Sequence, residues 1–200
     1  MYLPYNTPHD PFQVPDEYFE LYENLQPQPE MKQLEGFGDL KKAKYVYAMM
    51  TNMDDNIKRI VNLLHRLDVA DNTIILFMSD NGPAGWRYTG GLRGHKGEVF
   101  EGGIRVPAFI NYSGLPKQTE VDFPAAHYDI LPTLAELCGI PAPGTDGKSL
   151  LPALKGNPEA VPYRSLVIRE TNYMEPYRDI MIRKGDYKLA ARGGNANPEF

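Results

Sequence analysis

The chain has 200 residues, of which 42% are hydrophobic and 24% charged, proportions typical of a folded globular protein. The formal net charge is −5, and no stretch is dense in Lys and Arg, which argues against a protein that binds duplex DNA. The single cysteine, Cys138, excludes an internal disulfide framework and a cysteine-rich zinc module, and no run approaches the ~20 apolar residues of a membrane span.

Neither end of the sequence resembles the natural terminus of a protein. Residues 1–3 enter an apolar run without a polar lead-in or a signal peptide, and residues 192–200 stop without a closing element. We therefore expect the chain to be a fragment of a longer protein, in which a signal peptide could lie upstream.

The first third of the chain predicts a strand end, a long connection and a helix. Residues 1–5 have the composition of the end of a buried strand. Five prolines block regular structure in residues 6–38, which are expected to form an irregular connection. Apolar residues then recur at helical spacing from Leu40 to Leu67, and Asp39 is placed to cap this helix.

The middle of the chain reads as half of a βαβ unit followed by a glycine-rich loop. Residues 73–78 are apolar on both faces, as expected of a central parallel strand. Residues 79–103 are rich in glycine and predict a long loop, and a strand is expected over 106–112. A helix is expected over 128–137, with Pro132 in its first turns and Gly139 after its end.

The last sixty residues predict an antiparallel appendage. Residues 141–163 are a Pro- and Gly-rich connection, and residues 165–170 and 179–189 alternate apolar and polar side chains around a turn at 184–186. The expected fold is therefore α/β, with a mainly parallel sheet flanked by helices in residues 1–140. Residues 141–200 would form a linker and a partial antiparallel C-terminal subdomain.

The first chemical motif is Ser79-Asp80-Asn81-Gly82, directly after the apolar strand. In open α/β sheets ligands bind at the carboxyl ends of strands. The carboxylate of Asp80 and the amide oxygen of Asn81 are hard ligands that suit Ca²⁺ or Mg²⁺. The alternative is ordinary turn chemistry, which this tripeptide also favours.

The second motif is the basic glycine-rich segment around Gly94-His95-Lys96-Gly97. Its glycines allow the backbone to approach a ligand closely, and Arg93, His95 and Lys96 could bind a sulfate or phosphate oxyanion. The segment lacks the Gly-Lys-Ser/Thr of a nucleotide P-loop. The alternative is a solvated basic turn. Trp86, in the same loop, is a candidate for contact with the organic part of a substrate.

The third motif is Pro8-His9-Asp10-Pro11, which follows the expected N-terminal strand. A histidine in a stiffened loop can act as a general acid or stabilise developing charge, although a lone histidine often has a structural role. We favour a functional role because the other two motifs are expected at the same sheet edge.

These segments together resemble the type I (arylsulfatase-like) sulfatases of the alkaline phosphatase superfamily, over nearly the whole chain. Besides the three motifs, residues 127–134 and 182–189 match in order and spacing. The resemblance implies an alkaline-phosphatase-like fold, a sulfated small molecule or carbohydrate as the partner, and Ca²⁺ as a cofactor, bound by Asp80 and Asn81. It further implies that His9 and Lys96 contact the sulfate ester as catalytic and substrate-binding residues, and it makes a periplasmic or secreted location plausible.

The family's nucleophile has no counterpart in this sequence. It is a formylglycine made from Cys or Ser in Cys/Ser-x-Pro-Ser-Arg, a motif that is absent, and Cys138 is followed by Gly139-Ile140-Pro141 instead. The chain is therefore expected to be inactive alone and to hold an incomplete metal site. The alternatives are a phospho- or phosphonoester hydrolase of the same superfamily, and a non-catalytic truncated module.

Overall fold

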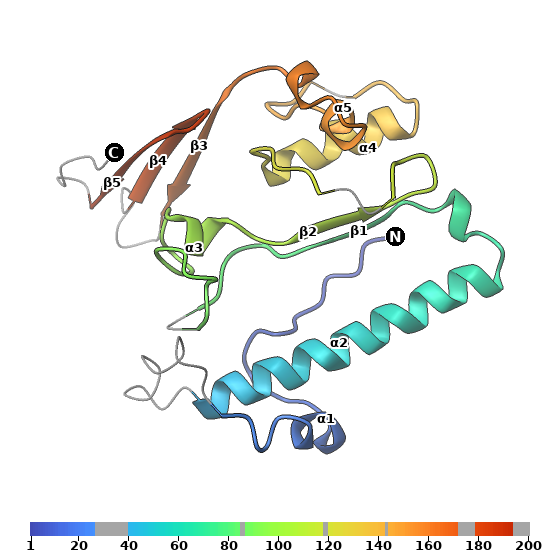
Figure 1. Ribbon diagram of the computed structural model, residues 1–200, viewed down its shortest axis with the longest axis vertical. Coiled ribbons are helices and arrows are strands. Elements are labelled where there is room, and N and C mark those ends of the chain that lie inside the picture. The colour runs from blue at the N-terminus through green and yellow to red at the C-terminus, as the bar shows by residue number, and fades with distance from the viewer. Residues whose placement is uncertain (27–39, 85–86, 118–119, 143, 172–178, 194–200) are drawn as a thin grey trace. The chain divides into compact units, whose positions relative to one another are not determined.

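The computed structural model of the chain describes residues 1–26, 40–84, 87–117, 120–142, 144–171 and 179–193 (Figure 1). These residues form two compact units. The first comprises residues 1–73 and 78–108, and the second comprises residues 74–77 and 109–200. Among the described residues, no helix combines the length and the apolar character needed to cross a membrane.

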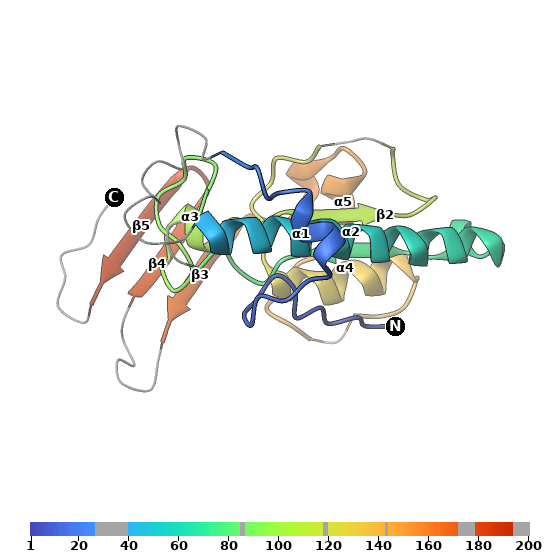
Figure 2. The ribbon, with the colours of Figure 1, turned by 90° about the horizontal axis from the view of Figure 1, so that it is seen from below.

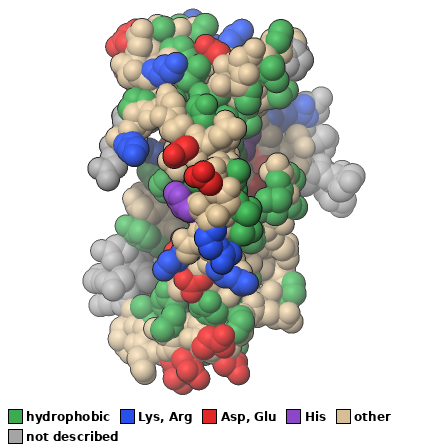
Figure 3. Space-filling model, turned by 90° about the vertical axis from the view of Figure 1, so that its right-hand side faces the viewer, with side chains coloured by type: hydrophobic (Ala, Val, Ile, Leu, Met, Phe, Trp, Pro, Cys, Tyr) green, Lys and Arg blue, Asp and Glu red, His purple; other side chains and the backbone are tan. Residues whose placement is uncertain are grey.

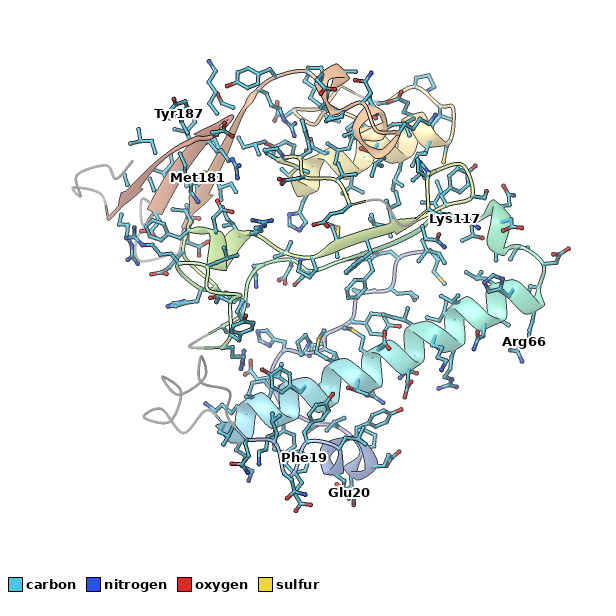
Figure 4. All side chains as sticks on the ribbon, viewed as in Figure 1. Phe19, Glu20, Arg66, Lys117, Met181 and Tyr187 are labelled. Atoms are coloured by element: carbon cyan, nitrogen blue, oxygen red, sulfur yellow. The ribbon has the colours of Figure 1, made fainter. Side chains whose placement is uncertain are left out.

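The first unit is built around two helices, α1 (Asp16–Glu20) and α2 (Leu40–Arg66), which lie side by side (Figures 1 and 2). The Phe19 ring lies 4.4 Å from the Tyr45 ring between centroids and points from α1 towards α2 (Figure 4). The hydroxyls of Tyr22 and Thr51 are 2.6 Å apart, and both are partly buried. An aromatic contact and a polar contact therefore hold α1 against the long helix.

The long helix α2 confirms the predicted element at 40–67, while the expected cap Asp39 lies outside the described residues. Its buried side chains are confined to the N-terminal half: Ala43, Val46, Ala48, Met49 and Met53. Burial, and to a lesser extent the nearby Tyr22, raises the pKa of the Tyr47 hydroxyl above its ordinary value. Met50 and Leu67, expected in the apolar stripe, are 40% and 60% exposed, because α1 covers only part of the helix.

The N-terminal segment departs from the sequence-based expectation in two ways. Residues 1–5 form no strand, and Met1 and Tyr2 are 104% and 86% exposed. An extended segment becomes a strand only when a neighbour accepts and donates its backbone hydrogen bonds, and no described residue does so here. The connection at 6–38, expected to be irregular, contains α1, in which the acidic residues Asp16 and Glu17 are exposed. Acidic side chains gather at the lower end of the face shown in Figure 3.

The strands β1 (Ile75–Met78) and β2 (Ala108–Asn111) form a two-stranded sheet, of which residues 75–77 and 109–111 belong to the second unit. Phe77 and Phe109 pack with ring centroids 6.3 Å apart. Both strands occur where the sequence predicts them. β1 is only half-buried, however, because β2 is its one partner strand among the described residues.

Helix α4 (Ile130–Leu137) follows a single 3-10 turn, η3 (His127–Asp129), and ends where Gly139 adopts a φ of 68°. The connection after it was expected to be irregular but includes α5 (Leu151–Leu154) and η4 (Pro158–Ala160). In each of these two short helices a proline occupies the first turn, where its missing N–H has no intrahelical partner to lose.

The carboxylate of Asp129 organises this part of the second unit. Asp129 is fully buried, and its oxygens accept hydrogen bonds from the backbone N–H groups of Ala126 at 2.8 Å and Lys148 at 2.9 Å. It also forms an ion pair with Arg164. The Asp129 carbonyl accepts the Thr133 hydroxyl at 2.6 Å. Segments far apart in sequence are thus tied to one side chain at the start of α4.

The C-terminal sheet is antiparallel, as predicted, with the order β3 (Ser165–Glu170), β4 (Asp179–Lys184) and β5 (Tyr187–Arg192) (Figure 2). Lys184 pairs with Tyr187, so the hairpin loop has two residues, and Gly185 supplies the required positive φ of 58°. Met181 is 2% exposed and Tyr187 is 85% exposed (Figure 4). The division at residue 140 into catalytic domain and subdomain stays a prediction.

Replacing Asp129 with alanine should lower the free energy of unfolding by about 3–5 kcal/mol, because it leaves the Arg164 cation buried without its counter-ion. Chemical denaturation monitored by circular dichroism measures the change. The matched control is Asp146→Ala, at an exposed position, which should stay within about 0.5 kcal/mol of the wild type. Equal effects of the two substitutions would contradict the role given to Asp129.

Candidate functional site: an Asp-Asn turn and a basic loop

The Asp80-Asn81-Gly82 turn follows directly on β1 and is closed by local hydrogen bonds. Asp80 Oδ1 accepts the Asn81 backbone N–H at 2.9 Å, and Asn81 Nδ2 donates to the Gly82 carbonyl at 3.0 Å. The Ser79 hydroxyl donates to the Asn81 carbonyl at 3.1 Å. These hydrogen bonds close the turn. They leave two side-chain oxygens, Asp80 Oδ2 and Asn81 Oδ1, available as acceptors.

Three glycines fix this turn against the basic loop by packing backbone directly on backbone. The Gly82 N–H donates to the Gly103 carbonyl at 2.8 Å, and the Gly102 N–H donates to the Arg93 carbonyl at 2.7 Å. A Cβ added at Gly82 would lie 1.9 Å from the Gly102 oxygen, and one at Gly102 would lie 2.1 Å from the Gly94 oxygen. We call Gly82, Gly102 and Gly103 the glycine clasp, because no other residue fits at these positions.

The clasp also fixes the segment that carries the predicted basic residues. A Cβ at Gly103 would meet the carbonyl oxygens of Glu98 and His95 at 2.3 and 2.4 Å. The Lys96 N–H donates to the Pro83 carbonyl at 2.9 Å, so the loop returns to the end of the Asp-Asn turn. The short helix α3 (Glu101–Ile104) contributes Gly102 and Gly103 to this packing.

The three basic side chains of the loop have different environments. Lys96 is exposed, and its ammonium pairs with no carboxylate in the described part of the chain. His95 Nδ1 lies 3.0 Å from the Lys96 carbonyl oxygen. The Arg93 guanidinium lies 3.8 Å from the centroid of the buried Phe100 ring, which fixes it in a cation–π contact. Lys96 is therefore the basic side chain best placed to bind an anion from solvent.

His9 belongs to the same compact unit and lies in a proline-bounded turn. Its N–H donates to the Asn6 carbonyl at 2.8 Å, and its ring Nδ1 lies 2.9 Å from a carboxylate oxygen of Asp10. The side chain of His9 is 57% exposed. Its segment touches the long loop through Phe12, whose ring lies 5.3 Å from the Arg87 guanidinium.

The structure thus brings Asp80, Asn81 and the Lys96 loop together through the clasp, and it connects the His9 segment to the same loop through Phe12 and Arg87. A direct approach of His9 to Lys96 stays a prediction. Trp86 lies outside the described residues.

The donor set suits part of a calcium site. Asp80 and Asn81 present a carboxylate and an amide oxygen on adjacent residues, which Ca²⁺ prefers, whereas a complete site takes six to eight oxygens. Within the described ranges, no group of three or more His, Cys, Asp or Glu side chains is arranged to hold a metal ion. The turn can therefore supply two ligands but not a whole site.

Sequence reasoning missed two features of this site. The first is the glycine clasp, whose signal in the sequence was the Gly102-Gly103 pair a short distance after Gly94 and Gly97. The second is Arg87 with Phe12, which no sequence pattern connects. Contacts between residues 75 positions apart depend on the tertiary fold.

Comparison with known proteins places the chain in a family. The sequence model of the sulfatase family matches residues 1–140. The chain is also 31% identical over 172 residues to the uncharacterized sulfatase YdeN of Escherichia coli, covering 83% of this chain and 29% of that protein. The chain belongs to the sulfatase family.

Two groups of solved structures share its fold. The structure of Ps i-CgsB in complex with k-i-k-neocarrahexaose is 27% identical with a TM-score of 0.77, covering 99% of this chain and 42% of that one. The phosphonate monoester hydrolase of Agrobacterium radiobacter is 25% identical with a TM-score of 0.60, covering 80% of this chain and 34% of that one. These similarities confirm the expected alkaline-phosphatase-like α/β class. The chain spans less than half the length of each of these relatives.

Replacing Gly102 with alanine should lower the free energy of unfolding by about 1–3 kcal/mol or more, because the new methyl group overlaps backbone atoms of the neighbouring loop. Thermal denaturation measures the effect. Gly144→Ala is the matched control, since a Cβ there meets nothing within 4 Å, and it should be close to neutral. A stable Gly102→Ala variant would show that the loop packs differently.

Proposed function

We propose that this chain forms part of the active site of a sulfuric ester hydrolase, in a protein that also carries the family's nucleophile. The observation that supports the proposal most directly is the glycine clasp, which fixes an oxygen-rich turn beside the backbone of Lys96, a lysine that pairs with no carboxylate in the described part of a chain of the sulfatase family. A cation site adjoining a lysine ammonium is an arrangement that suits a sulfate ester.

Lys96 is proposed to bind a sulfate oxygen. The Lys96 ammonium is exposed and pairs with no carboxylate in the described part of the chain. The backbone N–H of Lys96 donates to the Pro83 carbonyl, which fixes the backbone at this position. A fixed positive charge stabilises the negative charge that spreads over the sulfate oxygens as the ester bond breaks. Because the loop backbone is already fixed by the clasp, little reorganisation is needed at that moment.

His9 is proposed to interact with the ester or leaving-group oxygen. Its Nδ1 faces the Asp10 carboxylate and carbonyl, which leaves Nε2 as the ring nitrogen directed away from its own turn. An imidazole oriented through one nitrogen can donate a proton from the other. Asp10 would then act as the group that sets the ring's orientation.

Asp80 and Asn81 are proposed to supply two oxygen ligands to Ca²⁺, which as a Lewis acid would neutralise charge on the sulfate group. Formylglycine does not fit any residue of this chain. Cys138 is exposed at the end of α4 in the second unit and lacks the Cys/Ser-x-Pro-Ser-Arg motif. We therefore derive no step that passes through a nucleophile, and propose that the 200-residue chain alone is inactive.

The substrate is proposed to be a sulfated small molecule or carbohydrate, in line with the neocarrahexaose named in the complex of the similar Ps i-CgsB. A phosphonate or phosphate ester hydrolase is the second candidate, favoured by the similarity to a phosphonate monoester hydrolase. Asn81 argues for the sulfatase, because borderline metals such as Zn²⁺ prefer imidazole ligands to an amide oxygen. The third candidate function is that of a non-catalytic truncated module.

In a protein that joins this chain to the family's nucleophile motif, Lys96→Ala should lower kcat/KM for 4-nitrophenyl sulfate by at least ~100-fold, the loss typical of removing one oxyanion contact. Lys58→Ala, at an exposed position on α2, is the control and should leave the rate unchanged. The 200-residue chain alone should show no repeated turnover. A faster rate on 4-nitrophenyl phenylphosphonate than on the sulfate would support the second candidate instead.

The isolated chain should bind Ca²⁺ only weakly, with a Kd near the ~10⁻⁴–10⁻³ M of low-charge sites, because it contributes few ligands. Isothermal titration calorimetry measures the affinity, and Asp80→Ala should abolish it. Asp146→Ala should bind Ca²⁺ like the wild type. Calcium binding that persists in Asp80→Ala would locate the metal elsewhere.

A further inference from the structure

Arg87 is a cation in the long loop for which the described residues supply no counter-ion. Its Nε is buried and has no hydrogen-bond partner, and no carboxylate of the described residues pairs with its guanidinium. Other arginines of the chain differ in this respect, since Arg164 pairs with Asp129 and Arg192 with Asp179.

The position of Arg87 is fixed by an aromatic contact. The guanidinium lies 5.3 Å from the centroid of the Phe12 ring, and both side chains are half-buried. Phe12 comes three residues after His9, and Arg87 lies between the Asp80 turn and the Lys96 loop. The contact therefore connects the segment that carries His9 to the loop between the Asp80 turn and Lys96.

The loop has open positions shortly after Arg87 in sequence. Gly90 and Gly91 have φ values of 69° and 78°, and a Cβ on either would meet nothing within 4 Å. Tyr88, the next residue after Arg87, is 59% exposed. The same loop thus carries an exposed aromatic ring, two positions open to solvent and a guanidinium whose Nε has no acceptor among the described residues.

An anionic group of the ligand would supply the missing acceptor. A buried N–H without a partner costs free energy, and the planar guanidinium fork matches the oxygens of sulfate or carboxylate better than an ammonium does. From these observations we propose that Arg87 is a specificity-determining residue that binds a second anionic group of the substrate, so that the site prefers sulfate esters carrying an additional sulfate or carboxylate. This inference rests on the proposed sulfate site at Lys96.

The test compares ligands that differ by one anionic group, using the 200-residue chain and NMR titration. The probes are glucosamine 6-sulfate, D-glucosamine-2-N,6-O-disulfate and glucuronic acid 2-sulfate. The wild type should bind at least one doubly anionic probe about tenfold or more tightly than the monosulfate, since a hydrogen bond to a charged group contributes at least that factor. The stronger of the two identifies the second group as sulfate or carboxylate.

Arg87→Gln should remove this preference and leave the monosulfate affinity unchanged. Arg87→Lys keeps the charge but not the fork, and should retain part of the preference. The control Arg66→Gln, at the far end of α2 (Figure 4), should bind all probes like the wild type. Lys96→Ala should weaken the binding of every probe.

The two proposals fail in distinguishable ways. The first case is that Lys96→Ala weakens the binding of all probes, while Arg87→Gln either keeps the wild-type preference or lowers the affinity for all probes equally. The role of Arg87 is then overturned and the sulfate site stands. If the wild type binds no probe, or Lys96→Ala changes none of the affinities, both the sulfate site and the role of Arg87 are overturned.

Discussion

The direct contact of backbone with backbone in the glycine clasp is the constraint on which the candidate site depends. Gly82, Gly102 and Gly103 lack side chains exactly where the Asp-Asn turn, the basic loop and α3 converge, and two N–H···O bonds of 2.7 and 2.8 Å close the contact. A Cβ at these positions would lie 1.9, 2.1 and 2.3 Å from a carbonyl oxygen, so the segments would have to move apart. The proposed metal ligands and the proposed anion-binding lysine would then lose their fixed relationship.

The electrostatic character of the site follows from this packing. The clasp pairs backbone groups of the turn and the loop, and Asp80 uses only Oδ1 within the turn, where it accepts the Asn81 N–H. Asp80 Oδ2 and the Lys96 ammonium are therefore available for a ligand. Arg93 is different, because its guanidinium is held against the Phe100 ring and is therefore less available than the Lys96 ammonium to bind a substrate.

The second unit shows how the same chemistry serves stability instead. Asp129 is an acidic residue in a motif that the family resemblance also covers, yet its carboxylate is fully buried and its oxygens are occupied by two backbone N–H groups and Arg164. A carboxylate enclosed in this way cannot bind a metal or a substrate. The difference between Asp80 and Asp129 lies in exposure and in the number of partners, which residue type alone does not reveal.

The sequence by itself determined the elements whose signals are local. The 3.6-residue spacing of apolar side chains specifies α2, the alternation around Lys184-Gly185-Asp186 specifies the hairpin of β4 and β5, and the motifs around Asp80 and Lys96 identify the family. Tertiary structure decided the rest. Residues 1–5 lack the partner that would make them a strand, α1 exists because its aromatic residues pack on α2, and Arg87 meets Phe12 only in the folded chain. In each case the stabilising contact joins segments distant in sequence, and the free energy of such a contact depends on a neighbour that no local pattern specifies.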